Sequence, residues 1–163
     1  MEPDWEQIYQ ARYRRLVALV AMVTGSLPDA EEAVQEAFVR ALGRAGRGVD
    51  DPEAWLYRVA INHVRSRWRR LTVARRHAAT DEPLVTSGNP EDRLVLMAAL
   101  QRLPYAQREA LALHYVADMS VADIARRLDL PTGTVKARLS RGREALRALL
   151  ERNPSDLKRS SHV

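Results

Sequence analysis

Helical periodicity runs through almost the whole chain and is interrupted once, and this pattern constrains the fold more than any other feature. Apolar residues recur at intervals of three and four, strand-like alternation is scarce, and glycine and proline stand mainly at segment boundaries. Residues 72–89 lose the periodicity and gather threonine, serine, glycine and proline. The 163 residues have room for two small helical domains. The sequence therefore predicts an all-α protein with domains at 1–71 and 90–150, a flexible linker at 72–89 and a polar tail at 151–163.

Composition narrows the classes of protein that fit. The chain has no cysteine, which excludes a disulfide framework, a thiolate zinc site and a cysteine nucleophile. Its four histidines are scattered without the spacing of metal ligands. No apolar run approaches the roughly 20 residues of a membrane span, and the acidic N-terminus lacks the layout of a signal peptide. We expect a cytoplasmic protein without a bound metal or cofactor.

The distribution of charge is more informative than the net charge of +5. Residues 54–80 hold seven arginines and no acid, and residues 131–150 hold five basic residues against one glutamate. Residues 1–36 hold seven acids against three arginines. Two basic blocks, each within a helical pattern, predict two contacts with a polyanion such as nucleic acid. The alternative is that both blocks are solvated helix faces.

The clearest periodic helix covers residues 29–42. Asp29 is its expected N-cap, with Glu32 three residues later as in a capping box. The apolar stripe of this helix consists of Ala30, Ala33, Val34, Ala37, Phe38, Ala41 and Leu42. The outward face holds Glu31, Glu32, Gln35, Glu36, Val39 and Arg40. This face is therefore predominantly acidic, and it suits either a basic partner or plain solvation.

After a glycine-containing loop at residues 43–51, the next helix is expected at residues 53–71. Its predicted buried residues are Leu56, Val59, Ala60, Val64 and Trp68. A polar stripe along another face consists of Arg58, Asn62, Arg65 and Arg69, with Tyr57 and Ile61 beside it. Guanidinium and amide groups beside an aromatic ring are suited to gripping phosphates and meeting base edges.

The second half predicts a helix-turn-helix. Its helices are expected at residues 90–101, 105–116, 121–128 and 132–150. In the last two, the apolar contacts are assigned to Ile124, Ala125, Leu128, Leu130, Val135 and Leu139, and Thr132 is the expected cap of the final helix. The opposite face of that helix carries Gly133, Lys136, Ala137, Ser140 and Arg141, flanked by Arg138 and Arg143. This is the composition of a recognition helix that lies in the major groove.

Taken in order, these motifs resemble the extracytoplasmic-function (ECF) sigma factors of bacterial RNA polymerase. The first half resembles the family's sigma-two domain at residues 29–38 (DAEEAVQEAF), at 55–60 (WLYRVA) and at Asn62. The second half resembles its sigma-four domain at residues 103–104 (LP), 113–115 (LHY), 123–125 (DIA) and 134–139 (TVKARL). The resemblance covers about residues 5–71 and 90–150. It departs from the family at Ile61, Ser66, Asp123 and Ala137, where a basic residue, an acid, a glutamate and a serine are common.

The resemblance implies a sigma factor that binds core polymerase, directs it to promoters and helps to open the −10 region. It assigns docking on the polymerase clamp to Glu31, Glu32, Gln35 and Glu36. It assigns the −10 element to Trp55, Tyr57, Arg58, Asn62, Arg65 and Arg69, with the loop at 43–51 receiving a flipped base. It assigns the −35 element to Thr132, Gly133, Thr134, Lys136, Arg138, Ser140, Arg141 and Arg143. An anti-sigma factor is a further expected partner, and no small-molecule substrate is expected.

Two other classes of protein compete with this interpretation. An enzyme would need a catalytic set, yet the chain lacks a Ser/His/Asp arrangement or a phosphate loop. Glu32 and Glu36 are spaced as in carboxylate metal sites but have no partner histidines. A dimeric helix-turn-helix regulator explains the second half equally well, but it gives no reason for the acidic face or the second basic helix. For Trp55 and Tyr57 two roles remain open: each ring could stack on a base or pack in the hydrophobic core.

Overall fold

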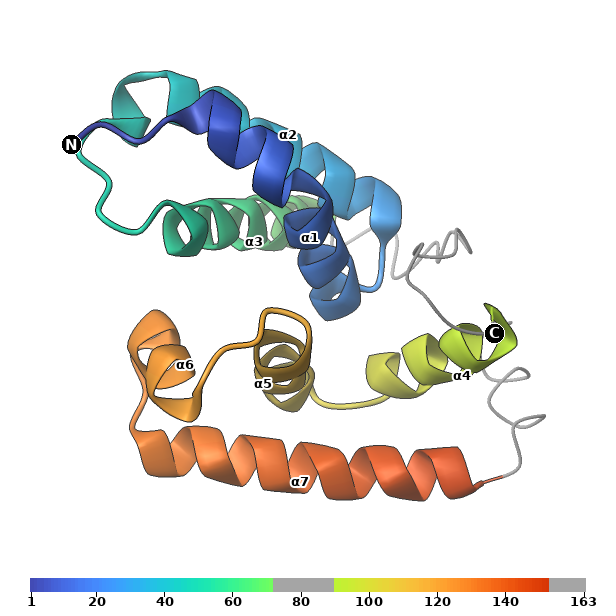
Figure 1. Ribbon diagram of the computed structural model, residues 1–163. Helices are drawn as coiled ribbons and strands as arrows, with labels where there is room; N and C mark the ends of the chain where they lie inside the picture. Colours follow the sequence, from blue (N-terminus) through green and yellow to red (C-terminus); the bar gives the residue numbers. More distant parts are fainter. Residues whose placement is uncertain (72–89, 153–163) are drawn as a thin grey trace. The chain divides into compact units, whose positions relative to one another are not determined.

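The computed structural model describes residues 1–71 and 90–152 of the chain, which divides into two compact units, Met1–Thr80 and Asp81–Val163. Figure 1 shows that every regular element in the described ranges is helical, which confirms the predicted all-α class. Unit 1 contains α1 (Trp5–Thr24), α2 (Leu27–Leu42), the short 3-10 turn η1 (Arg44–Gly46) and α3 (Pro52–Leu71). Unit 2 contains α4 (Pro90–Gln101), α5 (Tyr105–Tyr115), α6 (Val121–Leu128) and α7 (Thr132–Glu151). The expected linker at 72–89 and most of the expected tail, residues 153–163, lie outside the described residues.

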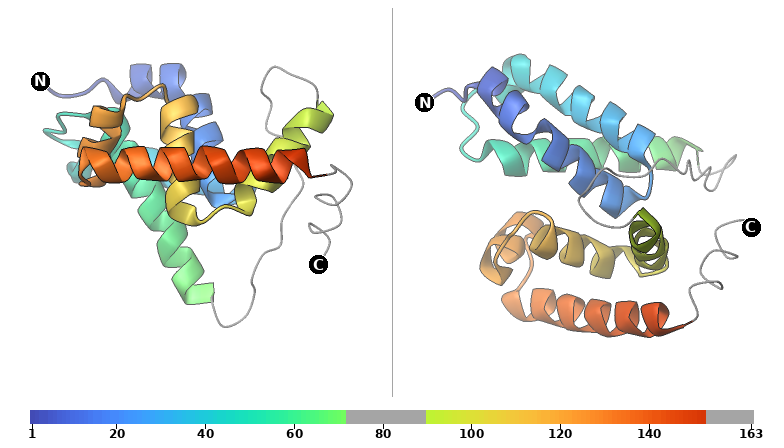
Figure 2. Two further views of the ribbon diagram at one scale, coloured as in Figure 1. Left: turned by 90° about the horizontal axis from the view of Figure 1, so that it is seen from below. Right: turned by 45° about the vertical axis from the view of Figure 1, so that its right-hand side comes forward.

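In unit 1, α2 is the central helix. It packs against both α1 and α3, and consecutive helices run in alternating directions (Figure 2). The inward stripe of α2 is rich in alanine, and Ala30, Ala33 and Ala37 are fully buried. Small side chains let the neighbouring backbones approach closely, while Val20, Leu56 and Val64 supply the bulk of the core from α1 and α3.

The N-terminus of α2 differs from the prediction. Its N-cap is Ser26, whose Oγ accepts a hydrogen bond of 3.3 Å from the backbone N–H of Asp29, and Asp29 lies in the first turn. Pro28 fits this earlier start because the first helical N–H groups have no partner within the helix. The capping box predicted for Asp29 and Glu32 is therefore wrong, although the carboxylate of Asp29 still suits the positive end of the helix dipole.

The buried face of α3 is rotated relative to the prediction. The structure buries Tyr57 and Ile61, which were placed beside the polar stripe, whereas Val59 and Trp68 are only half-buried. Tyr57, Ile61 and Val64 follow the spacing of four and three that marks an apolar face, so the signal was present in the sequence. The buried face of α3 therefore includes Tyr57 and Ile61, and the polar stripe lies on the opposite side of the helix.

In unit 2, α7 packs against α4, α5 and α6 (Figure 1). Ser120 caps α6, and Asp129 ends it in the left-handed region with φ of 53°. The chain then turns into α7, with Ile124 and Val135 fully buried between the paired helices. The predicted cap of α7 is wrong: Pro131 occupies the N-cap position, no side chain caps the helix, and Thr132 is its first residue.

Candidate functional site

The polar stripe of α3 forms an open basic face. Arg58, Asn62, Arg65 and Arg69 are all exposed, as their spacing around the helix predicts. The Nε of Arg69 donates a hydrogen bond of 3.5 Å to the backbone carbonyl of Arg65, which directs the Arg69 side chain back along the helix. The arrangement presents guanidinium and amide donors side by side to a polyanion.

The two aromatic candidates on α3 have different surroundings. Trp55 is half-buried against Trp5, with ring centroids 5.8 Å apart, so part of its ring reaches the surface. Tyr57 is 3% exposed and packs in the core. The described structure therefore places the Tyr57 ring away from the surface available to a base, contrary to the role assigned to it. The preceding loop ends at Asp51, whose Oδ1 accepts a hydrogen bond of 3.0 Å from the N–H of Ala54 at the start of α3.

The outward face of α2 is acidic at one end and apolar at the other. Glu31 and Gln35 are exposed, and Gln35 Nε2 donates a hydrogen bond of 3.3 Å to Tyr13 of α1. Val39 and Leu42 are 65% and 75% exposed, and their spacing of three places them next to each other on the helix surface. Val39 was predicted to face outward but was given no role, and Leu42 was assigned to the apolar stripe, where the structure does not place it.

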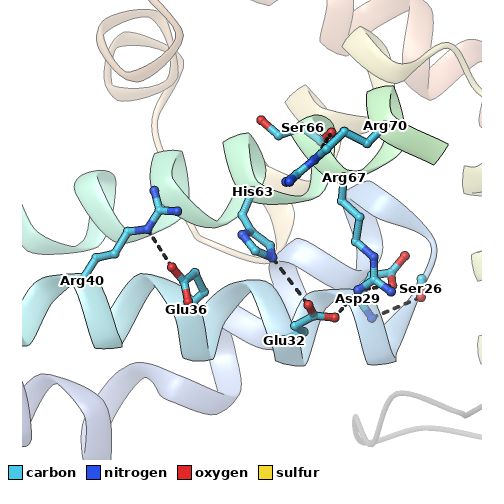
Figure 3. Close-up of polar contacts among 9 residues, drawn as sticks. All are labelled: Ser26, Asp29, Glu32, Glu36, Arg40, His63, Ser66, Arg67 and Arg70. Carbon is cyan, nitrogen blue, oxygen red and sulfur yellow. Dashed lines mark hydrogen bonds and ion pairs between the residues drawn. The ribbon is translucent and has the colours of Figure 1, made fainter. Parts of the chain in front are cut away.

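Two acids of this face interact with basic groups of the same unit. Figure 3 shows Glu36 next to Arg40, with 2.8 Å between Oε1 and Nε, and Glu32 in an ion pair with Arg67 of α3. Arg67 Nη1 also lies 3.6 Å from Asp29 Oδ1. His63 Nε2 lies 3.7 Å from Glu32 Oε1 and is buried without a hydrogen-bond partner. The first two turns of α2 are thus linked to α3 through charged groups.

Arg67 was counted in a basic block without being assigned a role. It lies nine positions after Arg58, which at about 100° per residue is half a turn around the helix. Arg67 therefore faces α2 (Figure 3), while Arg58 is exposed and belongs to the open stripe. Helical spacing could have placed Arg58 and Arg67 on opposite sides of α3. It could not have identified the acids that Arg67 contacts, because they belong to another helix.

The candidate recognition helix α7 presents its basic side chains to solvent. The exposed candidates are Thr132, Gly133, Lys136, Ser140, Arg141 and Arg143, and the half-buried ones are Thr134 and Arg138. Among the residues that the structure describes, Lys136, Arg138 and Arg141 have no ion-pair partner. Arg143 Nη1 donates a hydrogen bond of 3.3 Å to the hydroxyl of Tyr115 at the end of α5.

Two features are absent from residues 1–71 and 90–152. No group of three or more histidine or acidic side chains there is arranged to hold a metal ion. No helix in these ranges is long and apolar enough to span a membrane.

Comparisons with known proteins give a consistent result. The model of Sigma-70 region 2 matches residues 8–73, and that of Sigma-70, region 4 matches residues 93–146. The chain is 31% identical over 150 residues to the ECF RNA polymerase sigma factor SigM of Mycobacterium tuberculosis, covering 90% of this chain and 76% of SigM. It is 32% identical over 164 residues to SigW of Bacillus subtilis, covering 89% and 83%. The sigma factor RpoE of Bartonella quintana, solved with the anti-sigma factor NepR, has a similar fold, with a TM-score of 0.76 at 24% identity over 92% of this chain and 98% of RpoE.

Proposed function

The chain belongs to the ECF sigma factors of bacterial RNA polymerase, and we propose that its two units divide the work of promoter recognition between them. As a sigma factor it binds core polymerase and directs promoter-specific transcription initiation. The observation that carries the division of labour is the pairing of faces in unit 1, where α2 presents an acidic and apolar face and α3 an open basic stripe. A dimeric helix-turn-helix regulator does not require either the acidic and apolar face of α2 or the basic stripe of α3.

Core polymerase docks on the outward face of α2. We define this docking face as Glu31, Glu32, Gln35, Glu36, Val39 and Leu42. The acids complement a basic partner and the two exposed apolar side chains supply area to bury, a combination that is typical of specific protein interfaces. The partner element is the clamp coiled coil of the largest polymerase subunit, as the family resemblance implies.

The basic stripe of α3 contacts the −10 element. Arg58, Asn62, Arg65 and Arg69 hold the DNA backbone and base edges, and the accessible edge of Trp55 offers a surface for stacking. The loop at residues 43–51 receives a base that leaves the stack. Tyr57 has no direct role in this scheme because its ring is needed in the core.

The exposed face of α7 reads the −35 element in the major groove. Lys136, Ser140 and Arg141 are placed to reach base edges, and Arg138 and Arg143 flank them as phosphate contacts. The remaining candidates, Thr132, Gly133 and Thr134, form the first turn, where the positive end of the helix dipole favours a phosphate.

The catalytic chemistry belongs to the polymerase, so this chain acts by binding and not as an enzyme. It works in the cytoplasm, where polymerase and promoter DNA are found. RpoE of Bartonella quintana was solved with an anti-sigma factor, and an anti-sigma factor is likewise proposed as an inhibitor of this chain. Such an inhibitor would act by covering the docking face.

Charge reversal on the docking face tests this assignment. Replacing Glu31 and Glu36 together with lysine should abolish co-elution with bacterial core RNA polymerase in size-exclusion chromatography, because both charges would then repel a basic partner. The matched control replaces Glu144, an exposed acid of α7, with lysine and should leave co-elution unchanged. Normal co-elution of the double variant would refute the docking face.

A further inference from the structure

One arginine of the basic block in α3 is partly exposed and contacts acids of α2. Arg67 forms an ion pair with Glu32, and its Nη1 lies 3.6 Å from Asp29 Oδ1 (Figure 3). The side chain of Arg67 is 39% exposed, against 55% for Glu32 and 27% for Asp29. The guanidinium therefore joins α3 to the first turns of α2, at the edge of the docking face.

The neighbouring acids Glu31 and Glu32 differ in their surroundings. Glu31 is exposed and has no ion pair among the described residues. Glu32 faces Arg67, and His63 Nε2 lies 3.7 Å from its other carboxylate oxygen. Of two adjacent acids on the docking face, one is thus available to a partner and the other already has an intramolecular partner.

This intramolecular partner has a cost for docking. A basic partner that approaches Glu32 meets a carboxylate whose charge is already balanced, and it also meets the positive charge of Arg67 itself. Like charges brought together at an interface oppose association. Docking must therefore either displace the guanidinium or tolerate it.

We propose that Arg67 sets the affinity of polymerase docking by competing with the polymerase for Glu32, and that it is not a −10 contact. This inference rests on the docking face proposed above. It assigns Arg67 to the protein-binding side of unit 1, although the sequence places it in the block that was predicted to bind a polyanion. The chain thereby holds its affinity for core polymerase below what the docking face alone would give.

The test replaces Arg67 with glutamine and measures the Kd for purified core RNA polymerase by fluorescence anisotropy of the labelled full chain. We expect binding to tighten about three- to fivefold, the range of an exposed ion pair. In a Glu32→Gln background the same substitution should tighten binding less, because the contested carboxylate is gone. Arg67→Lys, which keeps the charge, should stay close to the wild type.

Arg58 provides the matched control. Arg58→Gln removes the same charge from the open stripe of α3, so it should leave the Kd for core polymerase unchanged and weaken holoenzyme binding to a single-stranded −10 oligonucleotide. Arg67→Gln should instead tighten binding to core polymerase and leave holoenzyme binding to the −10 oligonucleotide unchanged. Thermal unfolding of both variants checks that the fold is retained, since an exposed ion pair contributes little to stability.

The outcomes separate this inference from the docking assignment. If Arg67→Gln leaves core binding unchanged or weakens it, or if it weakens binding of the −10 oligonucleotide as Arg58→Gln does, the role of Arg67 proposed here is wrong. If Glu31→Gln and Glu36→Gln also leave core binding unchanged, the docking face itself is wrong. Weaker core binding by the glutamate variants without tightening by Arg67→Gln would overturn the inference alone.

Discussion

The functional faces of the two units differ in how their charged groups are partnered. In unit 1, Glu32 and Glu36 on the candidate face of α2 interact with Arg67 and Arg40 of the same unit. In unit 2, the residues described for α7 leave Lys136, Arg138 and Arg141 without ion pairs. The face of α7 therefore presents positive charge that no described acid balances, whereas two acids on the face of α2 are already paired within the unit.

Packing accounts for the interhelical part of this difference, the Glu32–Arg67 pair, whereas Glu36 and Arg40 are paired within α2. The central helix α2 is bordered on both sides by α1 and α3, so side chains at the edges of its outward face reach groups on a neighbour. The buried stripe of α7, which includes Val135, Leu139 and Gly142, lies along one side of the helix and leaves a wide arc exposed. The exposed face of α2 is therefore narrow, and some of its charges are paired with neighbouring groups. The exposed face of α7 is broader, and its basic charges are not paired with any acid that the structure describes.

The largest expected difference between the two units is in stability, because one glycine substitution should destabilise unit 1 alone. Gly46 is buried, and a Cβ added there would lie 1.9 Å from the backbone carbonyl oxygen of Ala41. Because backbone cannot move aside cheaply, Gly46→Ala should lower the free energy of unfolding of unit 1 by about 3 kcal/mol. Urea denaturation followed by tryptophan fluorescence measures this, since all three tryptophans lie in unit 1.

Gly142 of α7 is the matched position in unit 2. A Cβ there would lie 3.1 Å from Leu111 Cδ1, which belongs to a side chain that can adjust. Alanine also favours a helix over glycine by about 1 kcal/mol. Gly142→Ala should therefore change the stability of unit 2 by less than about 1 kcal/mol in circular dichroism, and should leave the tryptophan transition in place. Equal losses in the free energy of unfolding for Gly46→Ala and Gly142→Ala would show that the two glycines are packed equally tightly, contrary to this prediction.

The next effect concerns DNA binding by the unpartnered face of α7. Arg141→Ala should cost about 1–3 kcal/mol at the −35 element and relax sequence preference at one base pair. Electrophoretic mobility shifts of the holoenzyme on −35 variants measure it, with Arg147→Ala, an exposed arginine nearer the end of the helix, as the control. A uniform loss across all sequences, with a shallower salt dependence, would reassign Arg141 to a phosphate.

The smallest expected effect is a pH dependence in unit 2. Hydrogen bonds from Ser120 and Arg126 lower the pKa of Asp123 below its ordinary value of 3.8. A pKa that is lower in the folded state stabilises the fold above the ordinary value, and this contribution is lost as the pH falls through the lowered pKa. Unit 2 should therefore become less stable on acidification below about pH 4, and Asp123→Asn should reduce that dependence. Urea titrations by circular dichroism at pH 7 and pH 3 provide the measurement, and an unchanged dependence in the variant would rule out Asp123 as its source.

Much of the fold and part of the candidate site follow from the sequence because they depend on local spacing. The presence of the helices, the helix-turn-helix and the exposure of Arg58, Asn62, Arg65 and Arg69 each reflect a period of 3.6 residues, which fixes the side of a helix on which a residue lies. The chain's family could likewise be recognised from motifs that are short and contiguous.

The tertiary structure decided what each face contacts. Whether Tyr57 lies in the core or on the surface depends on how far α3 is rotated about its axis against α2, and spacing within one helix leaves that rotation open. The partner of Glu32 is Arg67, which is 35 residues away and on another helix, so no local pattern relates them. The helices and the chemistry of their faces thus follow from local spacing, whereas packing brings Arg67 to Glu32 and so fixes which charges are balanced before any partner binds.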